Sequence, residues 1–265
     1  MILAKLMRKN YLGIDIGGTN TRIVLLRGLR PQRVRALKFP TPRNCKAVET
    51  ELLEKILHFT NGAKLSGIGV GIAGVVSQKK KKVEVAEHLP FLEGWDPVTF
   101  FNKAFHISIR IENDSRCFLH AEALWGSARG KRNVLGIAIG TGIGGAIMID
   151  GKMYRGTHEI AGEVGDLVME HGRTFEASAA KKAFARWGDR SDVIGRGIAG
   201  LISIIDPELI VLGGGAVAAR KINLSAVRKA VGQFAVSREA AMTPIVFGKL
   251  GDAAQAIGAA LLFAD

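Results

Sequence analysis

Hydrophobic and polar residues alternate with two different periods along the chain. Residues 11–16 and 21–26 are short apolar runs on either side of the sequence GGTN, which predicts two strands joined by a tight turn. Residues 45–63 instead carry apolar side chains at helical spacing, and Asn61-Gly62 suits the end of a helix. The opening segment therefore predicts both kinds of element.

The same two patterns continue to the end of the sequence. Further strands are predicted at residues 34–40, 65–76, 106–113, 134–139, 144–150, 207–212 and 243–250. Further helices are predicted at residues 96–105, 114–128, 175–188, 191–206, 224–236 and 252–264. Asp114 or Ser115 is expected to cap the helix that begins near residue 114. Strands that alternate with helices indicate an α/β fold.

The segment 133–154 repeats the design of the segment 11–28. In each, an apolar strand leads into a turn of Gly and Thr and then into a second apolar strand. We interpret this as an internal duplication in which two β-hairpins each present a glycine-rich turn. The expected boundary lies near Glu112, so that residues 1–112 with 251–265 form a smaller N-terminal domain and residues 113–250 a larger one.

The composition is typical of a folded protein that is not exported. Hydrophobic residues make up 48% of the 265 residues, and no apolar run reaches the roughly 18–20 residues that span a bilayer. The opening MILAKLMRKN is interrupted by basic residues and has no small-residue cleavage site. Cys45 and Cys117 lie far apart with no CxxC, which argues against a disulfide framework or a cysteine-built zinc site. We expect a cytoplasmic protein.

Basic residues outnumber acidic ones, 37 to 24, for a formal charge of +13. Such a charge attracts anions, including nucleotides, sugar phosphates and nucleic acids, without choosing among them. The run at 79–82 lies between two strand-like segments and is interpreted as a solvated hairpin tip, with a phosphate-contacting patch as the alternative. Nucleic-acid binding is not favoured, because aromatic residues make up only 6% and no helix-turn-helix pattern is present.

Three glycine-rich turns follow apolar strands, at residues 15–20, 140–145 and 212–217. Glycine lets backbone amides approach an anion and accept left-handed torsions. None of the turns matches GxxxxGK[ST], and GTGIGG at 140–145 leads into a strand, whereas the dinucleotide fingerprint opens a helix. The turns therefore favour phosphates held between two hairpins over a P-loop or an NAD site.

Acidic residues stand next to these turns. Asp15 lies inside an apolar strand, where a carboxylate is costly unless it is paired or near a metal. It either starts the turn through a side-chain hydrogen bond or associates with Mg²⁺ beside nucleotide phosphates. Asn113-Asp114 ends a strand, where α/β proteins bind ligands, and Asp114 could accept a proton from an attacking hydroxyl. Glu163 and Asp166, in AGEVGD, could bind a substrate, bind a metal or form a solvated turn.

Five segments together resemble a known family. They are GIDIGGTNTRIVLL, IENDSRCFLHAEALWG, GIAIGTGIGGAIMIDGKMYRG, AGEVG and IIDPELIVLGGGAV. In this order, over about residues 12–262, they resemble the ROK family of sugar kinases and repressors, within the actin-like ATPase and sugar kinase superfamily. The resemblance implies a two-domain α/β fold of the actin-like ATPase (ribonuclease H-like) kind, with an interdomain cleft.

The resemblance also implies a ligand for each motif. ATP phosphates would lie at the first two turns and adenosine at the third, and Asp15 would hold Mg²⁺ through water. The residues expected to bind ATP in this way are Gly17, Gly18, Thr19, Asn20, Thr141, Gly142, Gly213, Gly214 and Gly215. Asp114 matches the catalytic base that activates the sugar hydroxyl. The sugar-binding positions are Asn113, Asp114, Glu163, Glu176, Asp166 and Gly74. A homodimer is common in the family and is expected here.

Two departures from the family pattern concern the substrate loop. Asp166 stands where the family has a His that binds sugar and often zinc, and the segment LVMEHGRTFEA has no Cys, so we expect no zinc. His158 and His171 are interpreted as solvated loop histidines, with replacement of the lost His as the alternative. Only ten residues, MILAKLMRKN, precede the first motif, which is too few for the helix-turn-helix of the family's repressors.

The leading hypothesis is an ATP-dependent kinase that phosphorylates a primary hydroxyl of a hexose. D-glucose, giving glucose 6-phosphate, is the leading substrate, and N-acetylmannosamine, N-acetylglucosamine, fructose and allose stay open. The alternative of another class is a non-catalytic sensor of sugar or nucleotide on a kinase fold. A nucleic-acid binder would rest on the net charge alone. We therefore expect sugar and ATP as partners, with no nucleic acid and no membrane.

Overall fold

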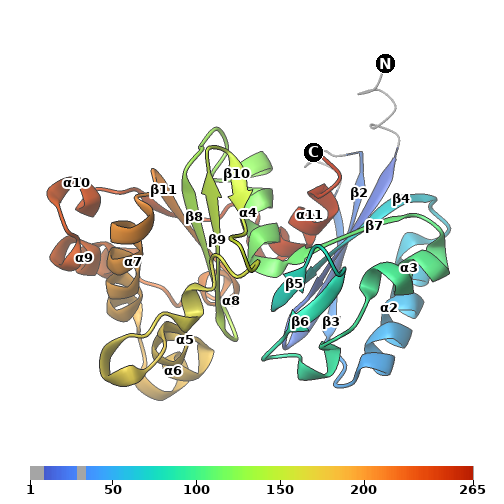
Figure 1. The fold of residues 1–265 in the computed structure, drawn as a ribbon, viewed down its shortest axis with the longest axis horizontal. Helices are drawn as coiled ribbons and strands as arrows, with labels where there is room; N and C mark the ends of the chain where they lie inside the picture. The colour runs from blue at the N-terminus through green and yellow to red at the C-terminus, as the bar shows by residue number, and fades with distance from the viewer. Residues whose placement is uncertain (1–8, 29–33, 265) are drawn as a thin grey trace. The chain divides into compact units, whose positions relative to one another are not determined.

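The computed structural model describes residues 9–28 and 34–264 (Figure 1). Most of the opening MILAKLMRKN, which we expect to be too short for a helix-turn-helix, lies outside the described residues. Within those ranges no helix is long and apolar enough to cross a lipid bilayer. The chain divides into two compact units: unit 1 comprises Met1–Ala121 with Ala253–Asp265, and unit 2 comprises Glu122–Asp252.

Unit 1 is built on a five-stranded sheet in the order β3-β2-β1-β4-β7. Its strands are β1 (Asn10–Ile16), β2 (Asn20–Arg27), β3 (Val34–Pro40), β4 (Leu65–Ile72) and β7 (Ser108–Asn113). β1, β2 and β3 form an antiparallel meander, whereas β1, β4 and β7 run parallel. The carboxyl ends of β1, β4 and β7 therefore lie at one edge of the sheet.

Helices cover both faces of this sheet. They are α2 (Cys45–Thr60), α3 (Pro97–Phe105), the first part of α4 (Asp114–Trp125) and α11 (Ala254–Leu261), with a 3-10 turn η1 (Pro90–Leu92). Leu12 and Ile14 pack in the core cluster that includes the buried face of α2. Gly13 faces the other way, where a Cβ would overlap the backbone of α11. The period-2 alternation of β1 thus serves two helical layers.

A two-stranded hairpin of β5 (Val75–Ser77) and β6 (Lys82–Val85) follows β4. The run at 79–82 forms its exposed tip, and Lys80 Nζ lies 3.0 Å from Glu84 Oε1. This confirms the interpretation of the basic run as a solvated hairpin tip.

Unit 2 has a second five-stranded sheet, in the order β10-β9-β8-β11-β12. The strands are β8 (Val134–Ile139), β9 (Ile143–Ile149), β10 (Lys152–Tyr154), β11 (Leu209–Gly213) and β12 (Ile245–Phe247). An antiparallel meander of three strands again joins two further strands that run parallel to its first strand. Both sheets thus share one topology, which confirms the internal duplication.

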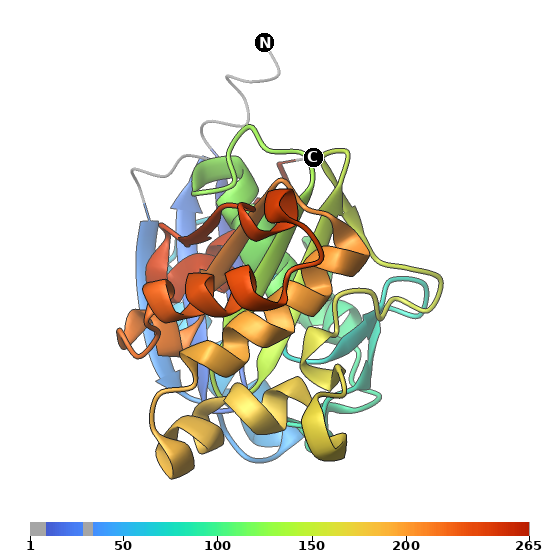
Figure 2. The ribbon, with the colours of Figure 1, turned by 90° about the vertical axis from the view of Figure 1, so that its left-hand side faces the viewer.

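The helices of unit 2 follow the predicted segments with two differences, a break within the helix predicted at 175–188 and the short helix α10, which was not predicted. They are α5 (Phe175–Ala179), α6 (Lys181–Trp187), α7 (Ser191–Ile205), α8 (Gly215–Ala218), α9 (Leu224–Phe234) and α10 (Arg238–Ala241). Three 3-10 turns, η2 (Val164–Asp166), η3 (Glu170–Gly172) and η4 (Gly251–Ala253), complete the set. Figure 2 shows α7 and α9 packed side by side. The single helix predicted at 175–188 is wrong, because Ala180 is extended and separates α5 from α6.

The two units divide within α4, between Ala121 and Glu122. We expected the division near Glu112, a residue at the end of β7, just before α4 begins. The first turns of α4 pack with unit 1, where Cys117 contacts both Gly71 of β4 and Gly258 of α11. The end of α4 belongs to unit 2, where Glu122 accepts hydrogen bonds from the amides of Lys249 and Leu250.

Candidate functional site

One edge of the unit 1 sheet gathers the expected site residues of that unit. The strand register pairs Ile16 of β1 with Ile72 of β4, and Ile72 with Asn113 of β7. The segments that follow these three strand ends therefore emerge together. They carry the turn at 17–20, then Gly74, then Asp114, at the edge where open α/β sheets bind ligands.

The turn at 17–20 is held by hydrogen bonds to a neighbouring segment. The amide of Gly17 donates to the carbonyl of Asn20 over 3.1 Å, closing the turn. Thr41 Oγ1 donates to the Gly17 carbonyl over 2.7 Å, and the Thr41 amide to the Thr19 carbonyl over 3.1 Å. These contacts engage three carbonyls of the turn and one of its amides, that of Gly17, so the conformation of the turn is fixed while its other amides are left out of these bonds.

Asp15 is 3% exposed and lies opposite Arg22 in the β1–β2 register. Arg22 Nη1 lies 3.3 Å from Asp15 Oδ2. This ion pair offsets the charge of the buried carboxylate. It differs from both roles considered from the sequence, a side-chain hydrogen bond that starts the turn and association with Mg²⁺. The hairpin spacing could have predicted it, since residues 15 and 22 flank a tight turn symmetrically.

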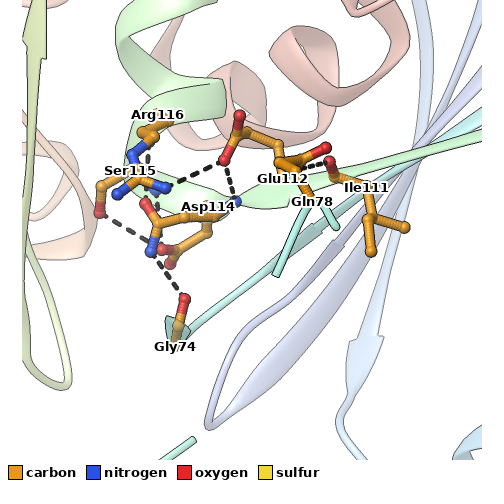
Figure 3. Close-up of polar contacts among 8 residues, drawn as sticks. Gly74, Gln78, Ile111, Glu112, Asp114, Ser115 and Arg116 are labelled. Carbon is orange, nitrogen blue, oxygen red and sulfur yellow. Dashed lines mark hydrogen bonds and ion pairs between the residues drawn. The ribbon is translucent and has the colours of Figure 1, made fainter. Parts of the chain in front are cut away.

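The Asn113–Asp114 turn joins β7 to α4, and Figure 3 shows the polar contacts around it. Asn113 Oδ1 accepts from the amide of Arg116 over 3.0 Å, and Asn113 Nδ2 donates to the carbonyl of Gly74 over 3.0 Å. The expectation that Asp114 or Ser115 caps the helix is therefore wrong: Asn113 does so, and Asp114 is the first helical residue. Because Asn113 caps α4, the Asp114 carboxylate is not needed as the helix cap.

Asp114 is partly open to solvent although its surroundings are densely packed. Its Oδ1 accepts from the amide of Ser115 over 2.7 Å and lies 3.3 Å from Ser115 Oγ. Burial raises the pKa of Asp114, while the hydrogen bonds from Ser115 and the charge of His88 act in the opposite direction. A carboxylate that is reachable and has a raised pKa is suited to accept a proton.

A matching edge in unit 2 gathers the other two glycine-rich turns. Gly213, at the end of β11, pairs with Ala138 near the end of β8. Gly214 has φ +86°, and a Cβ there would overlap the backbone of Ile139. Only a glycine lets the third turn approach the second turn so closely. Thr141 and Gly142 lie in that second turn, where the Gly140 amide donates to the Gly142 carbonyl over 2.8 Å.

Glu176 also reaches the second turn. Its Oε2 accepts from the amide of Ile143 over 2.8 Å. A Cβ on Gly165 would meet the Ile143 carbonyl and lie 3.6 Å from Glu176 Cβ, which places the η2 segment beside both. Glu163 precedes η2 and is half-buried, whereas Asp166 within it is exposed. The structure therefore brings the AGEVGD segment, Glu176 and the second turn together.

A cavity of about 400 Å³ opens in unit 2 between the end of α6 and the segment after α8. Buried Phe184 and Ile222 line it together with polar Asp189, Arg220 and Asn223. Binding sites for small organic molecules commonly combine apolar side chains with a few polar groups in this way. The sequence did not predict this cavity, because its lining comes from the end of α6 and the loop after α8, which are about 35 residues apart and are brought together only by packing.

Histidines and potential metal ligands are scattered in the described parts of the chain. Across residues 9–28 and 34–264 no three His, Cys, Asp or Glu side chains gather as metal ligands do. His158 and His171 are both exposed, as their interpretation as loop histidines predicts. Cys45 and Cys117 are free thiols.

Two residues that lie near the first glycine-rich turn were not predicted from the sequence. Arg43 Nη1 donates to the Gly18 carbonyl over 3.1 Å. His88 packs on Gly18, where an added Cβ would lie 2.8 Å from that of His88, and it also acts electrostatically on Asp114. No local pattern marks either residue, because each comes from a loop that the fold carries to the turn.

The sequence model described as the ROK family matches residues 11–181 and 173–265. An N-acetylgalactosamine kinase of Shewanella sp. is 29% identical over 253 residues, covering 77% of this chain and 81% of the relative. A glucokinase of Thermotoga maritima is 24% identical over 311 residues, covering 96% and 97%.

A crystal structure of a ROK family glucokinase from Streptomyces griseus, in complex with glucose and AMPPNP, superposes with a TM-score of 0.83. The two chains are 23% identical, and the match covers 96% of this chain and 98% of the other. This likeness confirms the predicted α/β fold of the actin-like ATPase kind. With the family's sequence model matching nearly all of the described chain, this protein belongs to the ROK family.

Proposed function

We propose that the protein is an ATP-dependent sugar kinase that transfers the γ-phosphoryl group to a primary hydroxyl of a hexose. The observation that carries the proposal is Asp114: a partly exposed residue whose carboxyl group has a raised pKa, at the carboxyl edge of a sheet and beside a glycine-rich turn. Phosphoryl transfer needs positioning, charge stabilisation and a group that accepts the hydroxyl proton. Asp114 supplies the last of these.

Asp114 is proposed to take the proton of the attacking sugar hydroxyl. Its hydrogen bond from the Ser115 amide holds one carboxylate oxygen and leaves the other to face the substrate. Asn113 would orient the sugar with Gly74, to which it is already hydrogen-bonded. Glu163, Glu176 and Asp166 are proposed as further ligands of sugar hydroxyls from unit 2.

The nucleotide is proposed to bind along the three glycine-rich turns. Gly17, Gly18, Thr19 and Asn20 in unit 1, with Thr141 and Gly142 in unit 2, would lie against the phosphates. The Gly17 amide already closes its own turn, so other amides of the two turns would donate to the phosphate oxygens. Gly213, Gly214 and Gly215 lead into α8, and the cavity beyond it offers Phe184 and Ile222 as apolar contacts for an adenine ring.

Asp15 is the residue proposed to hold Mg²⁺ through water. Its buried carboxylate stands directly before the phosphate turn, but Arg22 already offsets its charge. One carboxylate of this kind fits an ion that keeps most of its waters and takes its other ligands from phosphate. Mg²⁺ would neutralise charge on the β- and γ-phosphates.

D-glucose is the first substrate that we propose. Asn113, Asp114, Glu163 and Glu176 all match the glucokinase pattern, and the S. griseus glucokinase was crystallised with glucose. N-acetylated hexosamines are the alternative, because the Shewanella relative is an N-acetylgalactosamine kinase and Asp166 departs from the pattern. Fructose and allose also stay open.

A coupled assay of ADP release across a panel of these sugars tests the proposal. We expect turnover with at least one hexose and its loss by about 10²- to 10⁴-fold in Asp114→Asn, since this is what a general base contributes. Nucleotide binding by both proteins, measured by calorimetry, should be similar. Nucleotide binding without turnover of any sugar would favour the non-catalytic sensor.

Glu163→Gln separates sugar recognition from the nucleotide site. We expect a raised KM for the sugar with the KM for ATP unchanged, because the carboxylate is proposed to bind the sugar and not the nucleotide. Glu170→Gln is the matched control: Glu170 lies in the same loop but is exposed and pairs with Arg196 over 2.8 Å. Equal KM values in both variants would remove Glu163 from the sugar site.

A further inference from the structure

A buried ion pair spans the turn that carries Asp114. Arg116 Nη1 lies 3.2 Å from Glu112 Oε1, and each side chain is only 2% exposed. Glu112 is near the end of β7 and Arg116 is in the first turn of α4, so the pair brackets Asn113 and Asp114 (Figure 3). Neither Glu112 nor Arg116 has a role in the phosphoryl transfer proposed above.

Hydrogen bonds tie the ion pair to the backbone on both sides of Asp114. Glu112 Oε1 accepts from the amide of Asn113 over 2.9 Å. The amide of Arg116 donates to Asn113 Oδ1 over 3.0 Å. The Glu112 carboxylate therefore fixes the chain that enters Asp114 and also holds the guanidinium of Arg116, which follows Asp114 in α4.

Stability alone is a weak reason for such a pair. Two charges lose their hydration when they are buried, and apolar residues of similar volume are often as stabilising. An apolar pair at positions 112 and 116 would place no charge before or after Asp114 in the chain. Glu112 and Arg116 both act electrostatically on the Cys117 thiol of α4, as do Asp114 and Asp15. His88, from the loop before η1, acts on Asp114 itself.

We propose that Glu112 and Arg116 are positioning residues for Asp114, which hold its carboxylate in one orientation and balance each other's charge beside it. The proposal rests on the kinase function proposed above. Glu112 alone would disfavour the ionised form of Asp114, and Arg116 alone would favour it too strongly for a base. As a pair they leave Asp114 a proton acceptor whose affinity is set mainly by its burial.

Two single substitutions should have opposite effects on the pH dependence of turnover. In Arg116→Met the unpaired Glu112 carboxylate should move the acid limb of the kcat profile upward by about one pH unit, the lower end of the range for a neighbouring charge. In Glu112→Gln the unpaired guanidinium should move it downward by a similar amount. Both should lower kcat by more than ten-fold while the KM for ATP stays unchanged, and Arg116→Lys should recover part of kcat.

The double variant Glu112→Gln/Arg116→Met has no charge at either position, so its acid limb should return to that of the wild type. Lys55→Met is the matched control, because Lys55 and Glu51 form an exposed pair with the same spacing in α2, 3.3 Å apart. A merely structural pair would lower thermal stability in the single variants and leave their acid limbs where the wild type has its own. That result, or shifts in the same direction, would overturn the proposal.

Carboxyl ¹³C NMR separates this proposal from the kinase function. The Asp114 signal, identified by its absence in Asp114→Asn, titrates whether or not the protein turns over a sugar. Opposite shifts of its titration in the two single variants support the positioning pair even if no sugar is phosphorylated. Identical titrations in an active enzyme contradict the pair and leave the kinase function intact. If Arg116→Met does not fold, the downward shift in Glu112→Gln decides alone.

Discussion

Asp114 combines two properties that normally oppose each other, exposure to a substrate and enclosure by packed atoms. Burial raises its pKa, and the Ser115 hydrogen bonds limit the rise. Such a group costs stability at neutral pH, because the folded protein must hold a charge that the unfolded chain would hydrate fully. The burial of the charged Glu112 and Arg116 side chains nearby also lowers the stability of the folded protein. Strain of this sort is typical of functional sites.

Asp114→Asn should therefore be more stable than the wild type at neutral pH. The pKa in the folded state lies above the unfolded value, so the carboxylate's contribution to stability is lost as pH rises through the interval between them. Asn does not ionise, and its amide oxygen can still accept from the Ser115 amide. Calorimetric melting temperatures should differ most near pH 7 and converge towards the usual aspartate pKa of 3.8. A wild type that melts above the variant at pH 7 would contradict this.

Most strands and helices formed where their hydrophobic periods predicted them, but the strand predicted at 65–76 is divided into β4 and β5, and α10 was not predicted. Asn113 caps α4 in place of Asp114 or Ser115, and Ala180 interrupts the helix expected at 175–188. Both differences arise from tertiary contacts. Asn113 is held by Gly74, and the Lys181 amide donates to the Gly140 carbonyl, which stops a continuous helix. Helix α11 depends on tertiary contacts throughout, since glycines on β1 and β4 make room for it.

Gly258→Ala in α11 should destabilise the protein, whereas Gly232→Ala in α9 should stabilise it. An added Cβ at Gly258 would overlap the backbone of Cys117, but at Gly232 no other atom lies within 4 Å. Overpacking costs about 1–3 kcal/mol, and replacing an exposed helical glycine with alanine contributes up to about 1 kcal/mol. Urea unfolding measures both free energies. Equal effects of the two substitutions would show that α11 can move away from α4.

The whole molecule repeats one sheet topology, and each copy gathers its glycine-rich turns at the carboxyl edge of its parallel strands. Unit 1 contributes the candidate base and the first phosphate turn. Unit 2 contributes two more turns, the AGEVGD loop and the cavity near α6. The proposed reaction needs both sets of residues. The expected homodimer stays a prediction.

Sugar and nucleotide should each raise the melting temperature. A ligand that binds only the folded state stabilises it by about 2.7 kcal/mol at 100 times its Kd, which corresponds to roughly 5–10 °C for a protein of this size. Differential scanning fluorimetry with glucose, N-acetylhexosamines and Mg-AMPPNP measures the shifts. Duplex DNA at low salt is the comparison. A shift with DNA that disappears steeply as salt rises, with none from any sugar, would instead favour nucleic-acid binding.

The sequence by itself determined the α/β class, the duplication, the hairpin tip at 79–82 and the motifs of the ROK family. These features are local: they depend on apolar periods, glycine turns and residues that are neighbours in the chain. Most of the candidate site residues named from the sequence also lie in such motifs.

Only the tertiary structure decided which distant residues meet. Arg43 and His88 reach Gly18 from separate loops, Glu176 reaches the amide of Ile143, and Phe184 lies across a cavity from Ile222. Local periods carry no information about these contacts, because they arise when parallel strands bring their carboxyl ends to one edge. The Glu112–Arg116 pair depends partly on the sequence and partly on the tertiary structure. Its helical spacing can be read in the chain, but its burial beside Asp114, which makes the pair matter, comes from packing.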